Sequence, residues 1–243
     1  MNNLVHKNIC LLEEVLTSIR LLKEGMGTLQ EVGGGNDFYH APILLLSSGY
    51  ERLIKCILCL TSMDDNGIVK ETPFEITVSK GHDLIYLLNK LLSVCDEKGY
   101  SSKFPAAKVD VEFLKDEDLR KMVSRLSDFA QGGRYHNLDT VMKGTSSHTN
   151  PVTGWQKIEM TIFQSRKGLL EKLGENNSDI SKEVNREFII LLEKFARALA
   201  RLFTLADFGD LAKQASPLVY DYLMLKDKDL GTRDYRNTGV SRK

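Results

Sequence analysis

The stretch ILLLSSGYERLIKCILCL, at residues 43–60, decides the fold more than any other part of the chain. Its apolar residues fall on nearly all sides of a helix instead of alternating as they do in a half-buried strand. A helix that is apolar almost all round is usually buried at the centre of a bundle. We therefore predict a central helix over about residues 37–62, against which other amphipathic helices pack.

The same helical periodicity extends over most of the remaining sequence. Apolar residues recur every three or four positions, which is the spacing of one face of an α-helix. Ser79 is the expected cap of a third helix, since a serine hydroxyl accepts hydrogen bonds from the first amides of a helix. The sequence predicts an all-α, up-and-down helical bundle. Further helices are expected over residues 4–32, 79–97, 111–131, 155–173 and 180–210, with a loop at residues 98–108.

Residues 143–154, KGTSSHTNPVTG, are the strongest candidate for a loop between two parts of the chain. They separate a predicted bundle at residues 1–142 from a helical extension at residues 143–243. Packing of both parts as one domain is an equally good interpretation. The last residues, from 226 onward, are rich in charges, so we expect them to be exposed.

The composition excludes several classes of protein. The 33 basic and 33 acidic residues cancel, so the whole molecule has no electrostatic field that would attract nucleic acid or acidic lipid. The first apolar run contains acids, unlike a signal peptide, and no apolar run is long enough to span a membrane. Four cysteines without a secretion signal indicate reduced thiols and a cytoplasmic protein. Cys56 and Cys59 lack the second pair that a structural zinc site needs, so we expect them to pack in the core and expect no metal or cofactor.

Three polar side chains near the central helix are candidate ligand-binding residues. Glu51 and Lys55 stand four positions apart, so they share one face of the helix. His82 lies in SKGHDL, at the start of the third helix. The alternative interpretation is a surface ion pair at Glu51 and Lys55 and a histidine that merely bonds a neighbouring loop.

A second candidate lies in GGRYHN, directly after the fourth predicted helix. Two glycines allow a sharp turn, and Arg134, Tyr135 and His136 follow on a predicted loop. An arginine fork, an aromatic face and a titratable imidazole suit contact with phosphates and bases. Arg120, Lys121 and Arg125 would add local positive charge there. The alternative is a helix end followed by ordinary polar residues, with those cations on a solvated face.

The order of these features resembles the HEPN superfamily, helical domains named for nucleotide binding in higher eukaryotes and prokaryotes. The matching pieces are Glu51 and Lys55 in GYERLIKCIL, residues 80–84 in KGHDL, and Arg134 with Tyr135 in GGRYHN. Together they cover about residues 4–142. The resemblance implies a bundle that binds a nucleotide or an RNA phosphate, in a bacterial stress or phage-defence system.

Many HEPN domains are metal-independent ribonucleases, and the resemblance extends that possibility to this chain. Their motif is an arginine followed by a histidine after a gap of four to six residues, and two-fold pairing often joins two such motifs in one cleft. Arg134 and His136 are two positions apart, so this sequence departs from the motif. In a variant active site, His136 would act as the general base and Arg134 would hold the phosphate.

Three hypotheses follow from the sequence. The first is a protein that binds a nucleotide or RNA phosphate in one pocket. The second is a non-catalytic helical module that forms a homodimer or binds a partner protein. The third is a variant ribonuclease that uses His136 and Arg134. The expected binding residues in the first hypothesis are Glu51, Lys55, His82, Arg134, Tyr135 and His136.

Overall fold

The structure is a computed structural model that describes residues 3–33, 36–63, 69, 72–74, 80–165 and 177–237. These residues form an all-α protein, as the sequence predicts, and hold no β-strand beyond two isolated bridges. Within the same ranges, no helix combines the length and the apolar character needed to cross a lipid bilayer.

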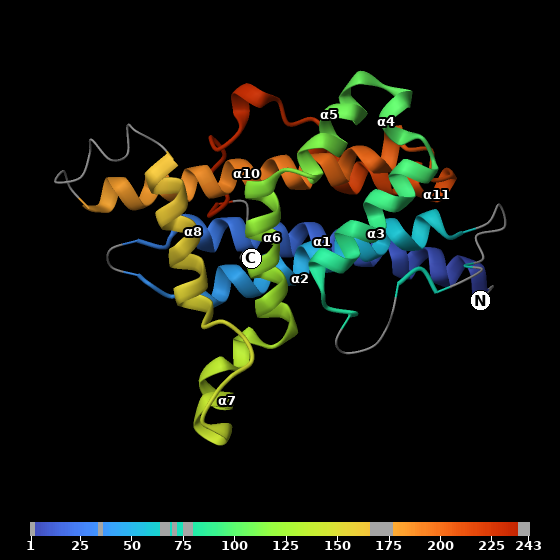
Figure 1. Cartoon of the computed structure of the whole chain (residues 1–243). Helices are drawn as coiled ribbons and strands as arrows, with labels where there is room; N and C mark the ends of the chain where they lie inside the picture. Colours follow the sequence, from blue (N-terminus) through green and yellow to red (C-terminus); the bar gives the residue numbers. More distant parts are fainter. Residues whose placement is uncertain are drawn as a thin grey trace.

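Three long helices lie side by side and form the first layer (Figure 1). They are α1 (Asn3–Gln30), α2 (His40–Thr61) and α10 (Asn177–Leu205). Two glycines let the backbones of α1 and α2 come close. A Cβ atom on Gly25 would stand 2.8 Å from the Leu46 side chain, and one on Gly49 would stand 2.8 Å from Leu22.

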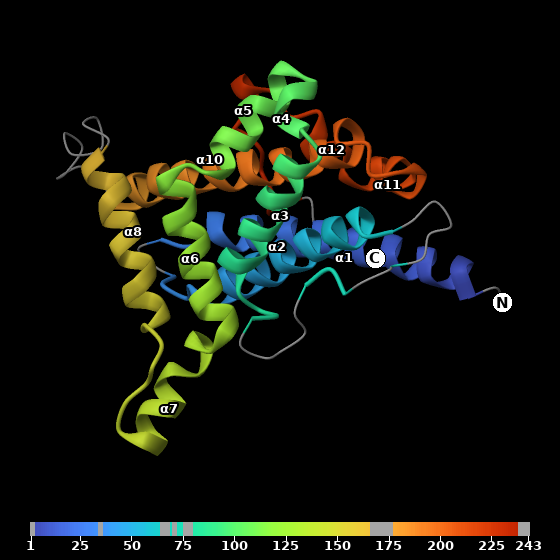
Figure 2. The same cartoon turned by 45° about the vertical axis from the view of Figure 1, so that its right-hand side comes forward.

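A second layer of helices crosses the first. α6 and α8 run steeply across α1, α2 and α10 in both views, and α3 lies beside α6 (Figures 1 and 2). Helix α7 projects away from both layers at one end of the molecule. The remaining bounds are α3 (Leu84–Glu97), α4 (Tyr100–Lys103), α5 (Pro105–Leu114), α6 (Glu117–Gln131), η1 (Gly133–Tyr135), α7 (His136–Lys143), α8 (Pro151–Ser165), α11 (Asp210–Ala215), η2 (Ser216–Val219), α12 (Tyr220–Leu223) and η3 (Asp227–Asp229).

The central position of α2 is confirmed by its burial. Twelve of its residues are buried, and they lie on several sides of the helix. The Tyr50 ring stacks on Phe195 of α10 with centroids 4.4 Å apart, and the Tyr50 hydroxyl donates to the Leu192 carbonyl. Cys56 packs in this core as predicted, and burial raises the pKa of its thiol well above the usual range.

Residues from both sides of position 143 contribute to one hydrophobic core. Trp155 of α8 stacks on Phe188 of α10 with centroids 4.5 Å apart, and both belong to the same buried cluster as the residues of α1 and α2. Helix α10 contacts α1, α2 and α5. The helices beyond residue 143 therefore cover the earlier ones directly.

Several predicted boundaries of helices are wrong, and caps explain two of them. Helix α3 begins at Leu84, because the Asp83 carboxylate accepts hydrogen bonds from the amides of Ile85 and Tyr86. Ser79 lies outside the described residues. The predicted loop at residues 98–108 holds α4 and the start of α5. The predicted helix over residues 111–131 is split, because Asp116 caps a new helix, α6.

The segment around GGRYHN is helical and not a loop. Arg134 and Tyr135 lie in η1, and His136 begins α7. The predicted loop at residues 143–154 is shorter than expected, because α8 begins at Pro151 instead of Trp155. The Asn150 side chain accepts from the amides of residues 152 and 153 and so caps this helix.

The prediction of an exposed tail from residue 226 holds for most of its charged residues up to 237, but it is wrong for two apolar positions. Leu230 and Tyr235 are buried. Both carboxylate oxygens of the buried Glu193 accept hydrogen bonds, one from the Tyr235 hydroxyl at 2.7 Å and one from the Gly231 amide at 2.6 Å. Gln30 of α1 bonds the backbone of the same segment at Arg233 and Tyr235. These anchors bury Leu230 and Tyr235, while Asp227, Lys228 and Arg236 stay exposed.

Candidate functional site

The structure brings together three of the predicted binding residues. The Glu51 carboxylate accepts from Lys55 Nζ at 2.7 Å and lies 3.0 Å from His82 Nδ1. Glu51 is the most buried of the three, with 13% of its side chain exposed, against 22% for Lys55 and 45% for His82. The Lys55 ammonium also stands 5.3 Å from the centre of the Phe74 ring. The lysine and the histidine therefore already have an acidic partner within the chain.

The other three predicted residues lie where α6 gives way to α7. Arg134 and Tyr135 are exposed, and the guanidinium stands 5.1 Å from the centre of the Tyr135 ring. His136 is half-buried, and its Nδ1 donates to the His148 carbonyl at 2.8 Å. Since His148 closes the turn after α7, this bond ties the two ends of the projecting arm together.

Asp128 holds the segment that connects α7 to α8. Asp128, on the last turn of α6, lies 2.9 Å from His148 Nδ1 and accepts the Thr149 amide at 3.0 Å. The His148 ring packs on Gly132, where a Cβ atom would stand 2.4 Å from His148 Nε2. The sequence analysis did not select this aspartate–histidine pair. A short polar residue and a histidine 20 positions apart give no local signal that they meet.

The two groups of predicted residues are not joined to each other. No hydrogen bond or ion pair between described residues links Glu51, Lys55 or His82 with the segment at residues 134–136. Glu51 and Lys55 lie on α2 with His82 just before α3, whereas Arg134 and Tyr135 lie in η1 and His136 begins α7.

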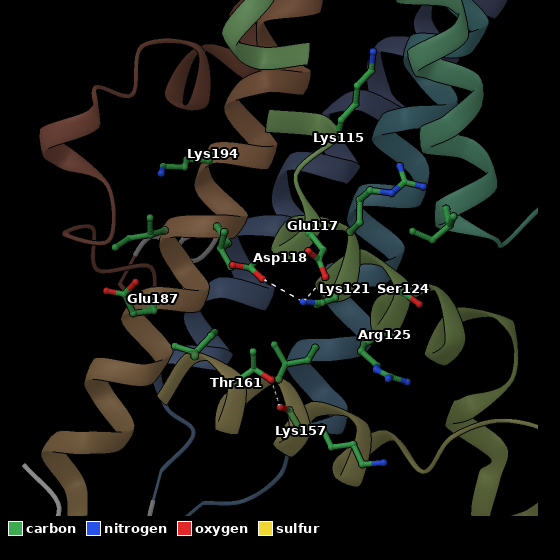
Figure 3. A pocket seen from close by; sticks show the side chains of 16 residues that line it. Lys115, Glu117, Asp118, Lys121, Ser124, Arg125, Lys157, Thr161, Glu187 and Lys194 are labelled. Atoms are coloured by element: carbon green, nitrogen blue, oxygen red, sulfur yellow. Dashed lines mark hydrogen bonds and ion pairs between the residues drawn. The ribbon is translucent and has the colours of Figure 1, made fainter. Parts of the chain in front are cut away.

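A hollow with a volume of about 630 Å³ lies between α6, α8 and α10 (Figure 3). We call it the α6–α8–α10 groove. Its floor is apolar and includes Ile158, Ile162 and Leu191. None of the six predicted binding residues lines it. Its volume lies within the range of about 300–1,000 Å³ that is usual for sites of small ligands.

The charges around this groove are predominantly positive. Six basic and three acidic residues line it, an excess of three positive charges in a chain with no net charge. Lys121 lies 2.8 Å from Glu117 and 3.7 Å from Asp118, and the hydrogen bond to Glu117 raises the pKa of Lys121. The basic residues are Lys115, Arg120, Lys121, Arg125, Lys157 and Lys194, and the acids are Glu117, Asp118 and Glu187.

Four of the six basic side chains have no acidic partner among the described residues. Arg120 donates instead to the Asn89 side-chain oxygen at 3.0 Å, whereas the side chains of Arg125, on α6, and Lys157, on α8, have no polar partner among those residues. Lys194 of α10 has an aromatic neighbour instead, since its ammonium stands 6.0 Å from the centre of the Phe113 ring. Arg125, Lys157 and Lys194 come from three different helices, and Figure 3 shows them around the rim of the groove.

The sequence holds part of the signal for this groove. Arg120, Lys121 and Arg125 were recognised as a possible source of local positive charge. Lys157 and Lys194 were missed, because each is one cation on an ordinary amphipathic helix. Their convergence depends on how α8 and α10 cross α6, which helical periodicity does not specify.

No group of three or more His, Cys, Asp or Glu residues that could hold a metal ion occurs in the described ranges. No family model matches the sequence, and neither a curated protein nor a solved structure shows a significant match to it.

Proposed function

We propose that this protein binds a phosphate-bearing ligand, a nucleotide or the phosphates of RNA, in the α6–α8–α10 groove. The observation that carries the proposal is the excess of positive charge around an apolar hollow of about 630 Å³. Arg125 and Lys157 would contact the phosphate, since neither has an acidic partner in the described chain. An arginine fork matches two phosphate oxygens, and a lysine adds a point charge.

The apolar floor fits the rest of such a ligand. Ile158, Ile162 and Leu191 would cover the base or the sugar, which have apolar faces. An acidic small molecule without an apolar part would gain only the electrostatic attraction, which salt screens at an exposed site. We therefore favour a nucleotide over inorganic phosphate.

Binding without cleavage is the simplest form of this proposal. The Nδ1 atoms of His136 and His148 are both engaged in hydrogen bonds that hold the turn after α7. Histidines that position a loop have one nitrogen fewer with which to exchange protons. The variant ribonuclease, with His136 as base and Arg134 on the phosphate, remains an outcome that a cleavage assay with His136→Ala would reveal.

Membership of the HEPN superfamily, with its bundle, is likewise a proposal. What supports it is that two of the three motif pieces meet, because Glu51 lies between Lys55 and His82. The proposed groove lies outside those motif positions, so the binding proposal does not depend on the resemblance.

The deciding experiment is a thermal shift of the purified protein with ATP, GTP and a short single-stranded RNA. A ligand at about 100 times its Kd stabilises by about 2.7 kcal/mol. For a protein of this size, that free energy corresponds to a rise in Tm of roughly 5–10 °C. We expect the rise in wild type and its loss in the Arg125→Ala, Lys157→Ala double variant.

Three single variants serve as controls for the other positions. Arg134→Ala and His82→Ala test the two predicted groups, and Arg20→Ala removes an exposed cation on α1 that does not line the groove. All three should keep the shift. Loss of the shift in Arg134→Ala or His82→Ala, with the double variant unaffected, would move the site to that position and overturn the assignment of the groove.

A second candidate function is self-association through the projecting arm, residues 135–142. Its apolar side chains are largely exposed: 60% at Leu138, 84% at Val141 and 79% at Met142. Tyr135, Leu138 and Met142 follow an i, i+3, i+7 spacing, so they share one face. An isolated helix of eight residues is marginal in water, which favours a partner for that face.

We propose a second copy of this chain as that partner. Asp139 and Lys143 pair within the arm at 2.8 Å. In an antiparallel pair of arms, each lysine could instead face the aspartate of the other copy, as a two-fold interface requires. Light scattering should give a dimer for wild type and a monomer for the Leu138→Glu, Met142→Glu variant. A wild-type monomer at high concentration would overturn this candidate.

A further inference from the structure

A further hollow also borders α10, with a volume of about 440 Å³. We call it the α5–α10 groove. It is bounded by α5, by α10 and by the C-terminal segment at residues 227–230, which the sequence analysis expected to be an exposed tail. Its charged lining residues are Asp110, Arg186, Lys194, Arg197, Asp227 and Lys228.

The two grooves adjoin along α10. Ile190 and Lys194 line both of them. A stripe of residues four, eight and eleven positions after Arg186 follows one face of the helix and reaches Ile190, Lys194 and Arg197. The two grooves therefore share part of their lining, and Lys194 is the cation common to both.

The acids of the second groove are already paired. The Asp110 carboxylate accepts from Arg201 at 2.8 Å, and the Asp227 carboxylate lies 2.8 Å from Arg197. The hydrogen bond from Arg197 lowers the pKa of Asp227, whereas burial raises the pKa of Asp110. Among the described residues, the cations without a carboxylate partner are Arg186, Lys194 and Lys228.

We infer that the two grooves form one track for a single-stranded oligonucleotide, with Lys194 at the junction. This inference rests on the proposed function and names the size of its ligand. The cations without an acidic partner run from Arg125 and Lys157 through Lys194 to Arg186 and Lys228.

A mononucleotide would occupy one end of this track and leave the other cations unused. A chain of phosphodiesters presents repeated negative charges with apolar bases between them. The track offers both features, because the apolar Ile190 and Phe113 line it together with its cations. RNA and DNA share this chemistry, and the test below separates them.

The test measures fluorescence anisotropy of labelled RNA and DNA of one sequence, at lengths of one, four and eight nucleotides. Wild type should bind the eight-nucleotide chain at least tenfold more tightly than the mononucleotide. Its affinity should also fall more steeply with salt, since each neutralised phosphate of a single strand adds about −0.7 to the salt slope. Tighter binding of the RNA would identify the 2′-hydroxyl as part of the recognition.

Variants separate the two grooves. Arg186→Ala with Lys228→Ala should leave mononucleotide binding intact and weaken the eight-nucleotide chain about tenfold. Because Arg186 also donates to the Gly231 carbonyl at 3.3 Å, Lys228→Ala alone provides a variant that removes no hydrogen bond between described residues. Arg125→Ala with Lys157→Ala should weaken ligands of every length, and Arg20→Ala should change none.

The outcomes distinguish this inference from the proposed function. If long chains bind no more tightly than mononucleotides and Lys228→Ala has no effect, the track is overturned and the single groove stands. If no nucleotide of any length binds, both proposals fail. If a polyglutamate of eight residues binds as tightly as the oligonucleotide, the track selects charge alone, and the assignment to nucleic acid is wrong.

Discussion

Helix α6 lines the α6–α8–α10 groove and also leads into the projecting arm at residues 135–142. The two regions differ in charge, in the exposure of their apolar side chains and in the number of helices that build them. The groove has charged side chains over an apolar floor, and three separate helices build it. The arm has apolar side chains exposed to solvent, and one short helix builds it. The GGRYHN motif, residues 132–137, lies where the arm leaves α6.

The difference shows how a ligand site depends on packing. Arg134 and Tyr135 have suitable chemistry, but they are exposed and stack on each other. Arg125, two and a half turns earlier, is half-buried between α6 and α8, where the neighbouring apolar surface reduces screening by water. A similar side chain is therefore a stronger candidate for binding phosphate in the groove than on the arm.

The largest expected effect comes from reversing the charge on each region in turn. Arg125→Glu with Lys157→Glu should lower nucleotide affinity by about a hundredfold or more, because each charged hydrogen bond contributes about 1.5–3 kcal/mol and repulsion adds to the loss. Leu138→Glu with Met142→Glu should leave that affinity unchanged and abolish dimerisation. Calorimetry and light scattering measure the two properties. Loss of affinity in the arm variant would mean that the two regions act together.

A smaller effect is expected where the arm leaves α6. Gly132→Ala would place a methyl group 2.4 Å from His148 Nε2 and push the ring away from Asp128. Such overpacking costs roughly 1–3 kcal/mol, which urea denaturation can measure. Asn137→Ala, exposed on α7, is the control and should change the stability little. An unchanged stability in Gly132→Ala would show that the arm is not anchored through His148.

The stability of the protein should depend on pH through Glu193, a buried acid near the α5–α10 groove. Burial raises the pKa of Glu193, which anchors the segment that walls the α5–α10 groove. The folded state then holds this proton more tightly than the unfolded state, so its contribution to stability is lost as the pH rises through the folded pKa. Glu193→Gln removes the ionisation while keeping a carbonyl for Gly231. The Tm of Glu193→Gln minus the Tm of wild type should increase from pH 5 to pH 8. A difference that stays constant over this range would contradict the prediction.

The smallest expected effect is on the arm itself. Met142→Ser should change the free energy of unfolding by less than about 0.5 kcal/mol in the monomer, because 79% of the side chain is already exposed. Leu126→Ala, on the buried face of α6, provides the contrast and should cost about 2–5 kcal/mol. Chemical denaturation at low protein concentration measures both. A large loss in Met142→Ser would indicate that the arm packs on the body of the protein.

Most helices could be predicted from the sequence, and the errors occur where a single polar residue decides the boundary. Asp83 and Asp116 start helices because their carboxylates accept hydrogen bonds from the first amides. The spacing of apolar residues alone does not show at which residue such a cap begins the helix. The ion pair of Glu51 with Lys55 was also predictable, because a spacing of four fixes it within one helix. His82 joins that pair from another helix, so its place there could only be a hypothesis.

The sequence by itself determined the all-α class and the central helix, because both follow from the spacing of apolar residues along the chain. Only the tertiary structure decided which polar residues share a surface. Lys157 and Lys194 meet α6 because α8 and α10 cross it, and the last residues pack inward because Glu193 offers a buried acceptor to Tyr235. Periodicity specifies which face of a helix is buried, whereas the neighbours of that face depend on how whole helices pack.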